Sequence, residues 1–345
     1  GGTRGHIPLA ASVPLIEWEG FPLPILASTS RAGGDTLGLT TIDKEVTNDK
    51  RERLGFLGGS PLVPPLITLA AGLILFSLFV PHFATVRTVS GFVSSASINA
   101  IVVIGVTLLM IAGEFDLSVG AIMAMGGLIF ASIMLDGGSP VVAFGLALLV
   151  AGALGAINGL LTIWTGIPSF IVTLGTRSIY RAAVWLLSGG LMLQTTDKLP
   201  VYNLFNGRLD IVNQFFTRAN FRTVTVWAIL LGLLVHFLLT RTAFGNHVFA
   251  IGGNPGAAVS QGVKTKRVKV ICFTIAGILS GLAGVMTFSQ FFTMFVATGK
   301  GLELTSIASA VAGGTVLTGG VGSIIGGLVG ILLINMLRTG VVFLG

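Results

Sequence analysis

The sequence predicts an all-α protein that crosses a membrane several times, that is, a polytopic helical membrane protein. Charged residues make up only 10% of the 345 residues, and the mean hydropathy is +0.94, which together exclude an ordinary soluble globular domain. Several continuous apolar runs reach the roughly 20 residues that a helix needs to cross the hydrocarbon core. These runs lack the alternation of barrel strands, and the 49 glycines suit closely packed membrane helices.

The first 60 residues differ in composition from everything that follows. They are rich in Gly, Pro, Ser and Thr, and they hold six Lys or Arg and seven Asp or Glu. Because such a segment cannot bury enough apolar surface to offset the loss of chain entropy, we expect residues 1–60 to be a disordered tail. The cluster Lys50, Arg51 and Arg53 precedes the first apolar run and favours a cytoplasmic N-terminus. The transmembrane domain is then 61–345.

Nine apolar runs follow the tail, and each is expected to be a membrane span. They lie at about 62–80, 92–112, 117–135, 141–164, 168–188, 223–240, 270–291, 302–318 and 321–337. The chain then enters a further apolar stretch at Val341–Gly345, so we expect ten spans with the last one truncated. Six crossings place the polar stretch 241–269 on the same side as the N-terminus, and they place 189–222 in an outer loop.

The stretch 241–269 is the long polar interruption in the second half of the chain. It carries five basic residues and no acid: Arg241, Lys264, Lys266, Arg267 and Lys269. Lys and Arg close to span ends resist translocation, so this stretch is expected on the cytoplasmic side. Its basic residues should face the membrane surface or the rim of a partner. The outer loop fits the same rule less well, since it has four Lys or Arg against two Asp.

A short helix is predicted in the middle of this stretch. Asn254 is a good N-cap residue, Pro255 suits the first helical position, and Gly262 is a favoured residue at a helix end. The apolar Ala258 and Val259 have no core of their own in so short a loop, so we expect a soluble partner to bury them. The residues assigned to this contact are Asn254, Pro255, Gly256, Ala257, Ala258, Val259 and Gly262.

Ionisable residues inside the apolar region are candidates for a solute pathway, because a charge at membrane depth is costly. In AGEFDLSVG (112–120), Glu114 and Asp116 either line a pathway or sit at a helix end, where Asp116 or Ser118 caps the next helix. Arg177 and Arg181 share one helix face. Structural pairing or snorkelling of these arginines and contact with solute are alternatives of equal weight; the acids available for pairing are Glu114, Asp116 and Glu303.

Two asparagines and three sets of glycines point to helix packing. Asn158 and Asn335 lie in apolar runs, where hydrogen bonding between helices is the first interpretation and contact with solute the second. Small residues four apart let helix backbones approach closely. The sets are Gly155 and Gly159, Gly277 and Gly281, and Gly322, Gly326 and Gly330.

The motifs of several enzyme classes are absent from the sequence. It has no G-x-x-x-x-G-K-[ST], no H-E-x-x-H and no G-x-S-x-G, so we expect no catalytic site, no metal and no cofactor in this chain. The single Cys272 lies in an apolar run and is read as a packing residue. The net charge of +7 belongs to loops that flank the membrane, so lipid rather than nucleic acid is the expected contact.

Four segments make the chain, from about residue 62 onward, resemble the permease subunit of a ribose-type ABC sugar importer. They are GEFDLSVG (113–120), AINGLLTIWTGIPSFIVTLGT (156–176), FGNHVFAIGGNPGAAVSQGV (244–263) and SAVAGGTVLTGGVGSIIGGLVGILLIN (309–335). The resemblance implies a permease of about ten spans in a bacterial inner membrane, paired with a second copy or a paralogue. It also implies a cytosolic P-loop ATPase that docks on 241–269, and an extracytoplasmic sugar-binding protein.

The chain also departs from the pattern of that family. Members usually have Glu where this chain has Gly256, and a basic residue where it has Val259. They more often have apolar residues where Glu114 and Arg177 stand, so we expect these two to pair with each other. Three other functions stay open: a branched-chain amino acid permease of the same superfamily, a self-contained secondary carrier that uses Glu114 or Asp116, and, more remotely, an intramembrane enzyme.

Overall fold

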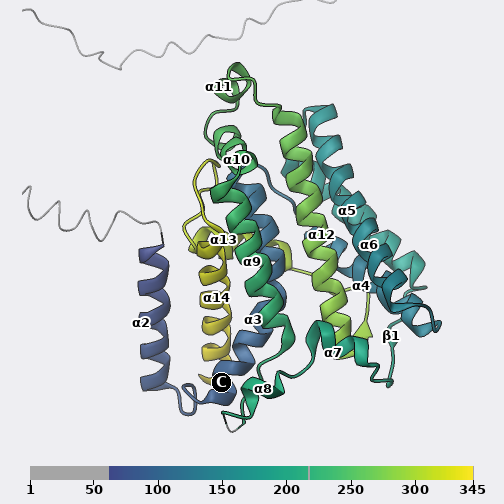
Figure 1. Ribbon diagram of the computed structural model, residues 1–345, viewed down its shortest axis with the longest axis vertical. Helices are drawn as coiled ribbons and strands as arrows, with labels where there is room; N and C mark the ends of the chain where they lie inside the picture. Colours follow the sequence, from purple (N-terminus) through teal and green to yellow (C-terminus); the bar gives the residue numbers. More distant parts are fainter. Residues whose placement is uncertain (1–61, 217, 345) are drawn as a thin grey trace, which may run out of the picture. The chain divides into compact units, whose positions relative to one another are not determined.

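The computed structural model describes residues 62–216 and 218–344 (Figure 1). The expectation of a disordered tail over 1–60 lies outside the described residues. The described part is helical apart from its connections and one pair of two-residue strands, so the all-α class is confirmed.

Thirteen helices are present in this part of the chain. They are α2 (Val63–Phe79), α3 (Val86–Ile111), α4 (Val119–Leu135), α5 (Pro140–Thr165), α6 (Ser169–Leu187), α7 (Pro200–Asn206), α8 (Asp210–Asn213), α9 (Thr223–Arg241), α10 (Ala243–Gly253), α11 (Pro255–Ser260), α12 (Thr265–Phe291), α13 (Leu302–Ala312) and α14 (Ile324–Leu344). The strands β1 (Leu193–Gln194) and β2 (Thr293–Met294) pair in antiparallel fashion.

Among the described residues, five helices are long and apolar enough to cross a membrane: α3, α5, α9, α12 and α14. Helices α2, α4 and α13 are apolar but shorter, so the total of nine or ten spans stays a prediction. A full span over 302–318 is wrong. Helix α13 has 11 residues, or about 16 Å of helix against a core of about 30 Å, and it ends at a glycine-rich stretch. Gly314, Gly319 and Gly320 there have positive φ angles, which a helix cannot contain.

The stretch 241–269 is mostly helical rather than a loop. Helix α10 covers its first part and α11 its middle, and the first five residues of α12 include Lys266, Arg267 and Lys269. Thr242 caps α10 by accepting a hydrogen bond from the amide of Gly245. The bounds of α3 also differ from the prediction: it begins six residues earlier, at Val86, where the Thr85 hydroxyl accepts from the amide of Thr88.

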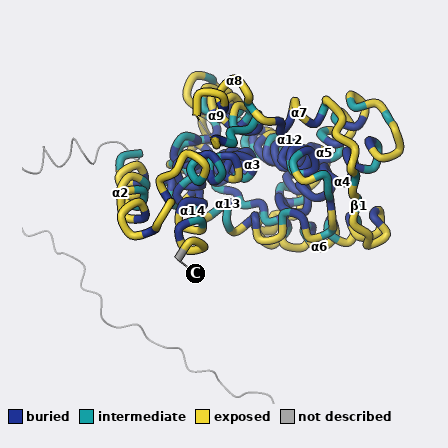
Figure 2. Tube along the Cα trace, turned by 90° about the horizontal axis from the view of Figure 1, so that it is seen from below, coloured by how far each residue is buried: buried dark blue, intermediate teal, exposed yellow. Residues whose placement is uncertain are grey.

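Helix α12 is the centre of the packing, with α3, α4 and α5 against it. Figure 2 shows that much of α3 and α12 is buried and that α6 is largely exposed. The predicted glycine contacts are confirmed: a Cβ on Gly155 would lie 3.1 Å from the Cα of Gly277, and one on Gly330 would overlap the carbonyl of Ser309. Small residues therefore let α5 approach α12 and α13 approach α14 with backbones in contact.

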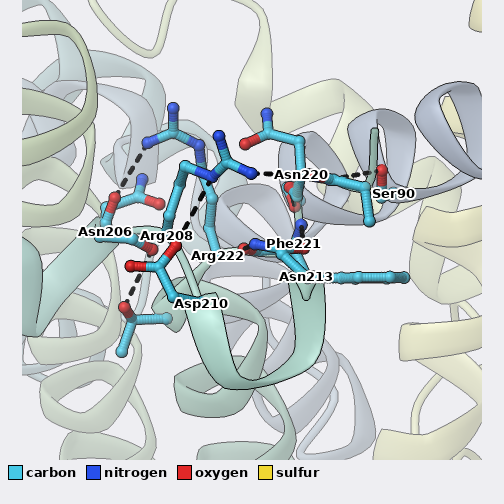
Figure 3. Close-up of polar contacts among 12 residues, drawn as sticks. Ser90, Asn206, Arg208, Asp210, Asn213, Asn220, Phe221 and Arg222 are labelled. Atoms are coloured by element: carbon cyan, nitrogen blue, oxygen red, sulfur yellow. Dashed lines mark hydrogen bonds and ion pairs between the residues drawn. The ribbon is translucent and has the colours of Figure 1, made fainter. Parts of the chain in front are cut away.

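The segment predicted as an outer loop contains β1, α7 and α8, and its described residues form hydrogen bonds with one another and with α3 (Figure 3). The Asn213 side chain exchanges two hydrogen bonds with the backbone of Phe221, at 2.8 and 2.9 Å. The amide of Asn220 donates to the Ser90 hydroxyl of α3 at 2.9 Å, and Arg222 donates to the Asn206 carbonyl. Burial, and to a smaller extent the charge of Arg208, lowers the pKa of Arg222. These contacts fix the segment against the helices at one end of the array.

Candidate functional site

The candidate residues fall at two opposite ends of α12. Helix α12 begins at Thr265, close to α11, and ends at Phe291, close to β2. Its 27 residues correspond to about 40 Å of helix. We call the first the α11 end and the second the β1–β2 end, and they are well separated in Figure 1.

Helix α11 forms as the sequence predicts. The Asn254 side chain accepts a hydrogen bond from the amide of Ala257 at 3.0 Å, and Pro255 occupies the first helical position. At the other end Gly262 has φ +79°, and the amide of Val263 donates to the carbonyl of Ala258 at 3.0 Å. These bonds satisfy the terminal backbone groups, so a helix of only six residues is well formed.

One expectation about α11 is wrong. Ala258 is only 3% exposed and belongs to the protein's own apolar core, together with Val248 of α10 and Val268 of α12. The reason is that α10 and α12 flank α11 and cover one side of it. The prediction treated this stretch as a loop without neighbouring helices. Val259 points outward and is 58% exposed. Val259 is therefore the large apolar side chain that α11 offers to a partner.

The α11 end is joined to the middle of the helix array by glycine contacts. The amide of Gly320 donates to the carbonyl of Ile111 at 2.9 Å. A Cβ on Gly319 would lie 2.7 Å from the Cα of Gly113, and one on Gly252 would overlap the amide nitrogen of Gly320. The end of α10, the turn after α3 and the stretch after α13 thus touch backbone to backbone, which leaves no room for side chains between them.

Glu114 forms an ion pair with Lys269 of α12, which corrects two expectations. The first was a pair between Glu114 and Arg177. The second was that Lys269 faces the membrane surface or the rim of a partner. The two side chains are 9% and 23% exposed, so the pair is largely buried. A buried carboxylate such as that of Glu114 is stabilised by the nearest positive charge. The start of α12 brings the Lys269 ammonium next to it.

Asp116 lies at the centre of a fully buried hydrogen-bond network. Its Oδ1 accepts from the amide and from the hydroxyl of Ser118, both at 2.7 Å. Asn158 of α5 donates to Ser118 Oγ at 2.7 Å and to Asp116 Oδ2 at 3.3 Å, and Tyr180 of α6 donates to Asn158 at 2.9 Å. The helix-to-helix role expected of Asn158 is confirmed. Ser118 is the N-cap residue of α4, and the carboxylate rather than its own hydroxyl binds the backbone there.

The arginines of α6 reach the segment that follows β2. Arg177 Nη2 lies 2.7 Å from Oε1 of Glu303, which is the pairing that the structure selects from the three acids considered. Arg181 donates to the carbonyls of Val296 and Thr298, the latter at 2.7 Å. Asn335 does not follow the expectation of a bond between helices, because its amide donates to the carbonyl of Ile331 in its own helix. The carbonyl of Ile331, four residues back on the same helix, is an acceptor within reach of the Asn335 amide, so Asn335 needs no partner on another helix for this hydrogen bond.

Three cavities open at the β1–β2 end. The α3–α12 cavity has a volume of about 680 Å³, the α3–α14 cavity about 740 Å³ and the α6 cavity about 660 Å³. The first two share Ser95, and the first and third share Ala297 and Lys300. Of the predicted pathway residues, only Arg177 and Arg181 line one of the three, namely the α6 cavity. Glu114, Asp116, Asn158 and Asn335 do not line them.

The α3–α12 cavity is lined by residues that the sequence reasoning missed. Its polar side chains are Ser95, Asn99, Thr287, Gln290, Thr293, Thr298, Lys300, Thr305 and Arg338, and its aromatic ones are Phe291 and Phe295. Asn99 and Gln290 lie in apolar runs, as Asn158 does, so the same criterion could have found them. Lys300 and Arg338 do not belong to any motif found in the sequence. Only the fold brings them to one cavity.

Comparison with known proteins finds permease components of transport systems in every case described below. The family model for the branched-chain amino acid transport system permease component matches residues 88–345. A ribose import permease protein of Bacillus subtilis (strain 168) is 35% identical over 304 residues, which is 87% of this chain and 91% of the relative. A D-allose transport system permease protein of Escherichia coli (strain K12) is 34% identical over 76% of this chain and 78% of its own length.

An L-arabinose ABC transporter permease protein of Azospirillum brasilense is 33% identical over 77% of this chain and 76% of the relative. No solved structure matches the chain. The family model and these three relatives each cover well over two thirds of the chain. The chain therefore belongs to the family of branched-chain amino acid transport system permease components, on the branch of the ribose-type ABC sugar permeases.

Proposed function

We propose that this chain is the permease subunit of an ATP-driven importer and forms the translocation pathway for a monosaccharide or a similar polyol. The observation that carries the proposal is the similarity, over 87% of the chain, to a permease named for ribose import, with two further relatives named for allose and arabinose. A second copy of the chain or a paralogue completes the pathway. ATP is hydrolysed on a separate cytosolic subunit, and an extracytoplasmic binding protein delivers the sugar.

The α3–α12 cavity is the part of the pathway that this chain supplies. Its hydroxyl and amide side chains, among them Ser95, Asn99 and Gln290, can exchange hydrogen bonds with sugar hydroxyls. Phe291 and Phe295 offer apolar surface to the face of a sugar ring.

The α11 end is the side on which the ATPase docks. Lys264, Lys266 and Arg267 are exposed around it, which favours a cytoplasmic location. Val259 and the small Gly256 give α11 a compact surface suited to a groove on a partner. The glycine contacts of Gly113, Gly252 and Gly319 connect this surface to the turn between α3 and α4, so a displacement of α11 reaches the helices that line the cavity.

The alternative functions receive less support. A secondary carrier would need Glu114 or Asp116 to exchange protons with solvent, yet the first is paired with Lys269 and the second is enclosed by Ser118 and Asn158. A branched-chain amino acid permease is not favoured, because the three relatives above are named for sugars.

The test is uptake of labelled monosaccharides by proteoliposomes. Vesicles that hold the chain alone should show no concentrative uptake with ATP. Uptake should appear when the ATPase and the binding protein that co-purify with the chain are added together with ATP. Concentrative uptake by the purified chain alone, driven by a proton gradient, would instead establish a secondary carrier.

A further inference from the structure

Among the described residues, those that line the cavities of the β1–β2 end include several Lys and Arg but no Asp or Glu. Six Lys or Arg line them: Arg87, Arg218, Lys300, Arg338, Arg177 and Arg181. Within the described residues, only Arg177 of these six forms an ion pair, with Glu303. Arg181 is held by two backbone carbonyls. Lys300 and Arg338, which line the central α3–α12 cavity, have no carboxylate within 4.0 Å in the described part of the chain.

This excess of cations is not explained by topology. Lys and Arg gather on the side that is not translocated, and the α11 end has that role here. The six residues lie at the opposite end, where translocation works against positive charge. It is not explained by stability either, because Lys300 and Arg338 are exposed to the cavity and hold no partner in place. A cleft lined by positive charges raises the local concentration of anions.

The other lining groups of the α3–α12 cavity suit a small polyhydroxylated ligand. Asn99, Gln290 and Thr305 provide hydrogen-bonding side chains, and Phe291 is an exposed aromatic surface. A volume of about 680 Å³ lies in the ordinary range of small-molecule sites. A neutral sugar would use these groups and leave two cations without a counterpart. A sugar that also carries an anionic group would use them all.

We infer that the solute carried by this permease is an anionic monosaccharide, bearing a carboxylate or a phosphate, whose charged group lies against Lys300 and Arg338. Arg87 and Arg218, which line the adjoining α3–α14 cavity, attract it toward the site. This inference rests on the proposed function and narrows its substrate class.

The test is saturation-transfer NMR on the full chain in nanodiscs, with D-ribose, D-ribonate and D-ribose 5-phosphate as matched probes. At about 50 mM salt, at least one anionic probe should bind about tenfold more tightly than D-ribose, and the preference should shrink as salt is raised. Lys300→Met and Arg338→Met should each lower the affinity for that anion about threefold, and together they should remove the preference. The affinity for D-ribose should not change.

Two control variants separate this from a general effect of charge. Lys300→Arg should keep the preference, and Arg241→Met, which removes a cation at the other end, should leave it unchanged. Equal binding of D-ribose and both anions, or a preference that survives the double variant, would overturn the inference. Loss of affinity for the binding protein with no change in anion preference would also overturn it, because the cations would then serve docking.

The vesicle assay separates this inference from the proposed function. ATP-dependent uptake of neutral sugars alone would leave the importer standing and remove the anionic substrate. Absence of ATP-dependent uptake for every saccharide, neutral or anionic, would remove the importer itself.

Discussion

The two ends of the helix array differ in how their charges are partnered, and the buried Arg177–Glu303 pair is the exception at the β1–β2 end. At the α11 end each buried charge has a partner: Glu114 pairs with Lys269, and Asp116 accepts hydrogen bonds from Ser118 and Asn158. At the β1–β2 end, Lys300 and Arg338 line a cavity that has no Asp or Glu among its lining residues in the described part of the chain. The difference shows which charges hold helices together and which are left for a ligand.

Burial is the physical reason for the difference. A charge removed from water costs several kcal/mol unless a partner of opposite sign and good hydrogen bonds replace the water. Side chains in an open cavity keep their water and need no partner, so they can stay unpaired at little cost until an anion arrives. The expected effects of substitution on stability therefore fall from the buried pair to the cavity cations.

The largest effect on stability is expected for the Glu114–Lys269 pair. Lys269→Met or Glu114→Gln alone leaves one largely buried charge without a partner and should lower the free energy of unfolding by about 2 kcal/mol. The double variant should lose less than the sum of the two single losses. Denaturant unfolding of the purified chain in detergent measures all three. Simple additivity would contradict the pairing.

The Asp116 network should come next. Asp116→Ala leaves the amide and hydroxyl of Ser118 without their acceptor, at a cost of about 1.5 kcal/mol. Asp116→Asn keeps one acceptor oxygen and should cost less. The same unfolding experiment compares them, and equal losses for both variants would show that acceptor oxygens are not what the site needs.

A smaller and asymmetric effect is expected within α11. Ala258→Asp places a carboxylate in the protein's own core and should lower the free energy of unfolding by about 1 kcal/mol or more. Val259→Asp changes an exposed position and should stay within about 0.5 kcal/mol. The two variants change adjacent residues of one helix, and the same unfolding experiment compares them. Equal losses of unfolding free energy would mean that Ala258 and Val259 do not differ in burial.

The smallest effect on stability is expected at the β1–β2 end. Lys300→Met and Arg338→Met remove cations that hold nothing in place, so the free energy of unfolding should change by less than about 0.5 kcal/mol. A loss as large as that of Lys269→Met would show that these cations are structural, and the contrast between the two ends would disappear.

Sequence reasoning succeeded where the deciding contacts are local. Helix α11 follows from Asn254, Pro255 and Gly262, which act within a few residues of one another. The close contact of Gly155 with Gly277 follows from spacing along each helix. The family resemblance from about residue 62 onward likewise rests on contiguous segments, and the match over residues 88–345 confirms it.

The remaining parts depend on contacts between distant residues. Glu114 and Lys269 are 155 positions apart, and their pairing is decided by the packing of α3 against α12. Hydropathy alone predicts a span over 302–318, because Gly313 and Gly314 do not lower it much. The positive φ angle of Gly314 nevertheless keeps the helix from continuing. Asn99 and Gln290 of the α3–α12 cavity are recognisable as polar residues in apolar runs, but no motif joins Lys300 to Arg338, and only the fold brings these two cations together.

The central claim is that the α11 end couples to an ATPase and the β1–β2 end handles solute. The direct measurement follows ATP hydrolysis and uptake of an anionic sugar together, in vesicles with the complete transporter. Val259→Asp puts a carboxylate into the coupling contact and should lower both rates about tenfold or more. Lys300→Met should lower uptake about threefold and leave ATP hydrolysis unchanged. Wild-type rates of hydrolysis and uptake for Val259→Asp would contradict the account, since α11 would then not be the coupling element.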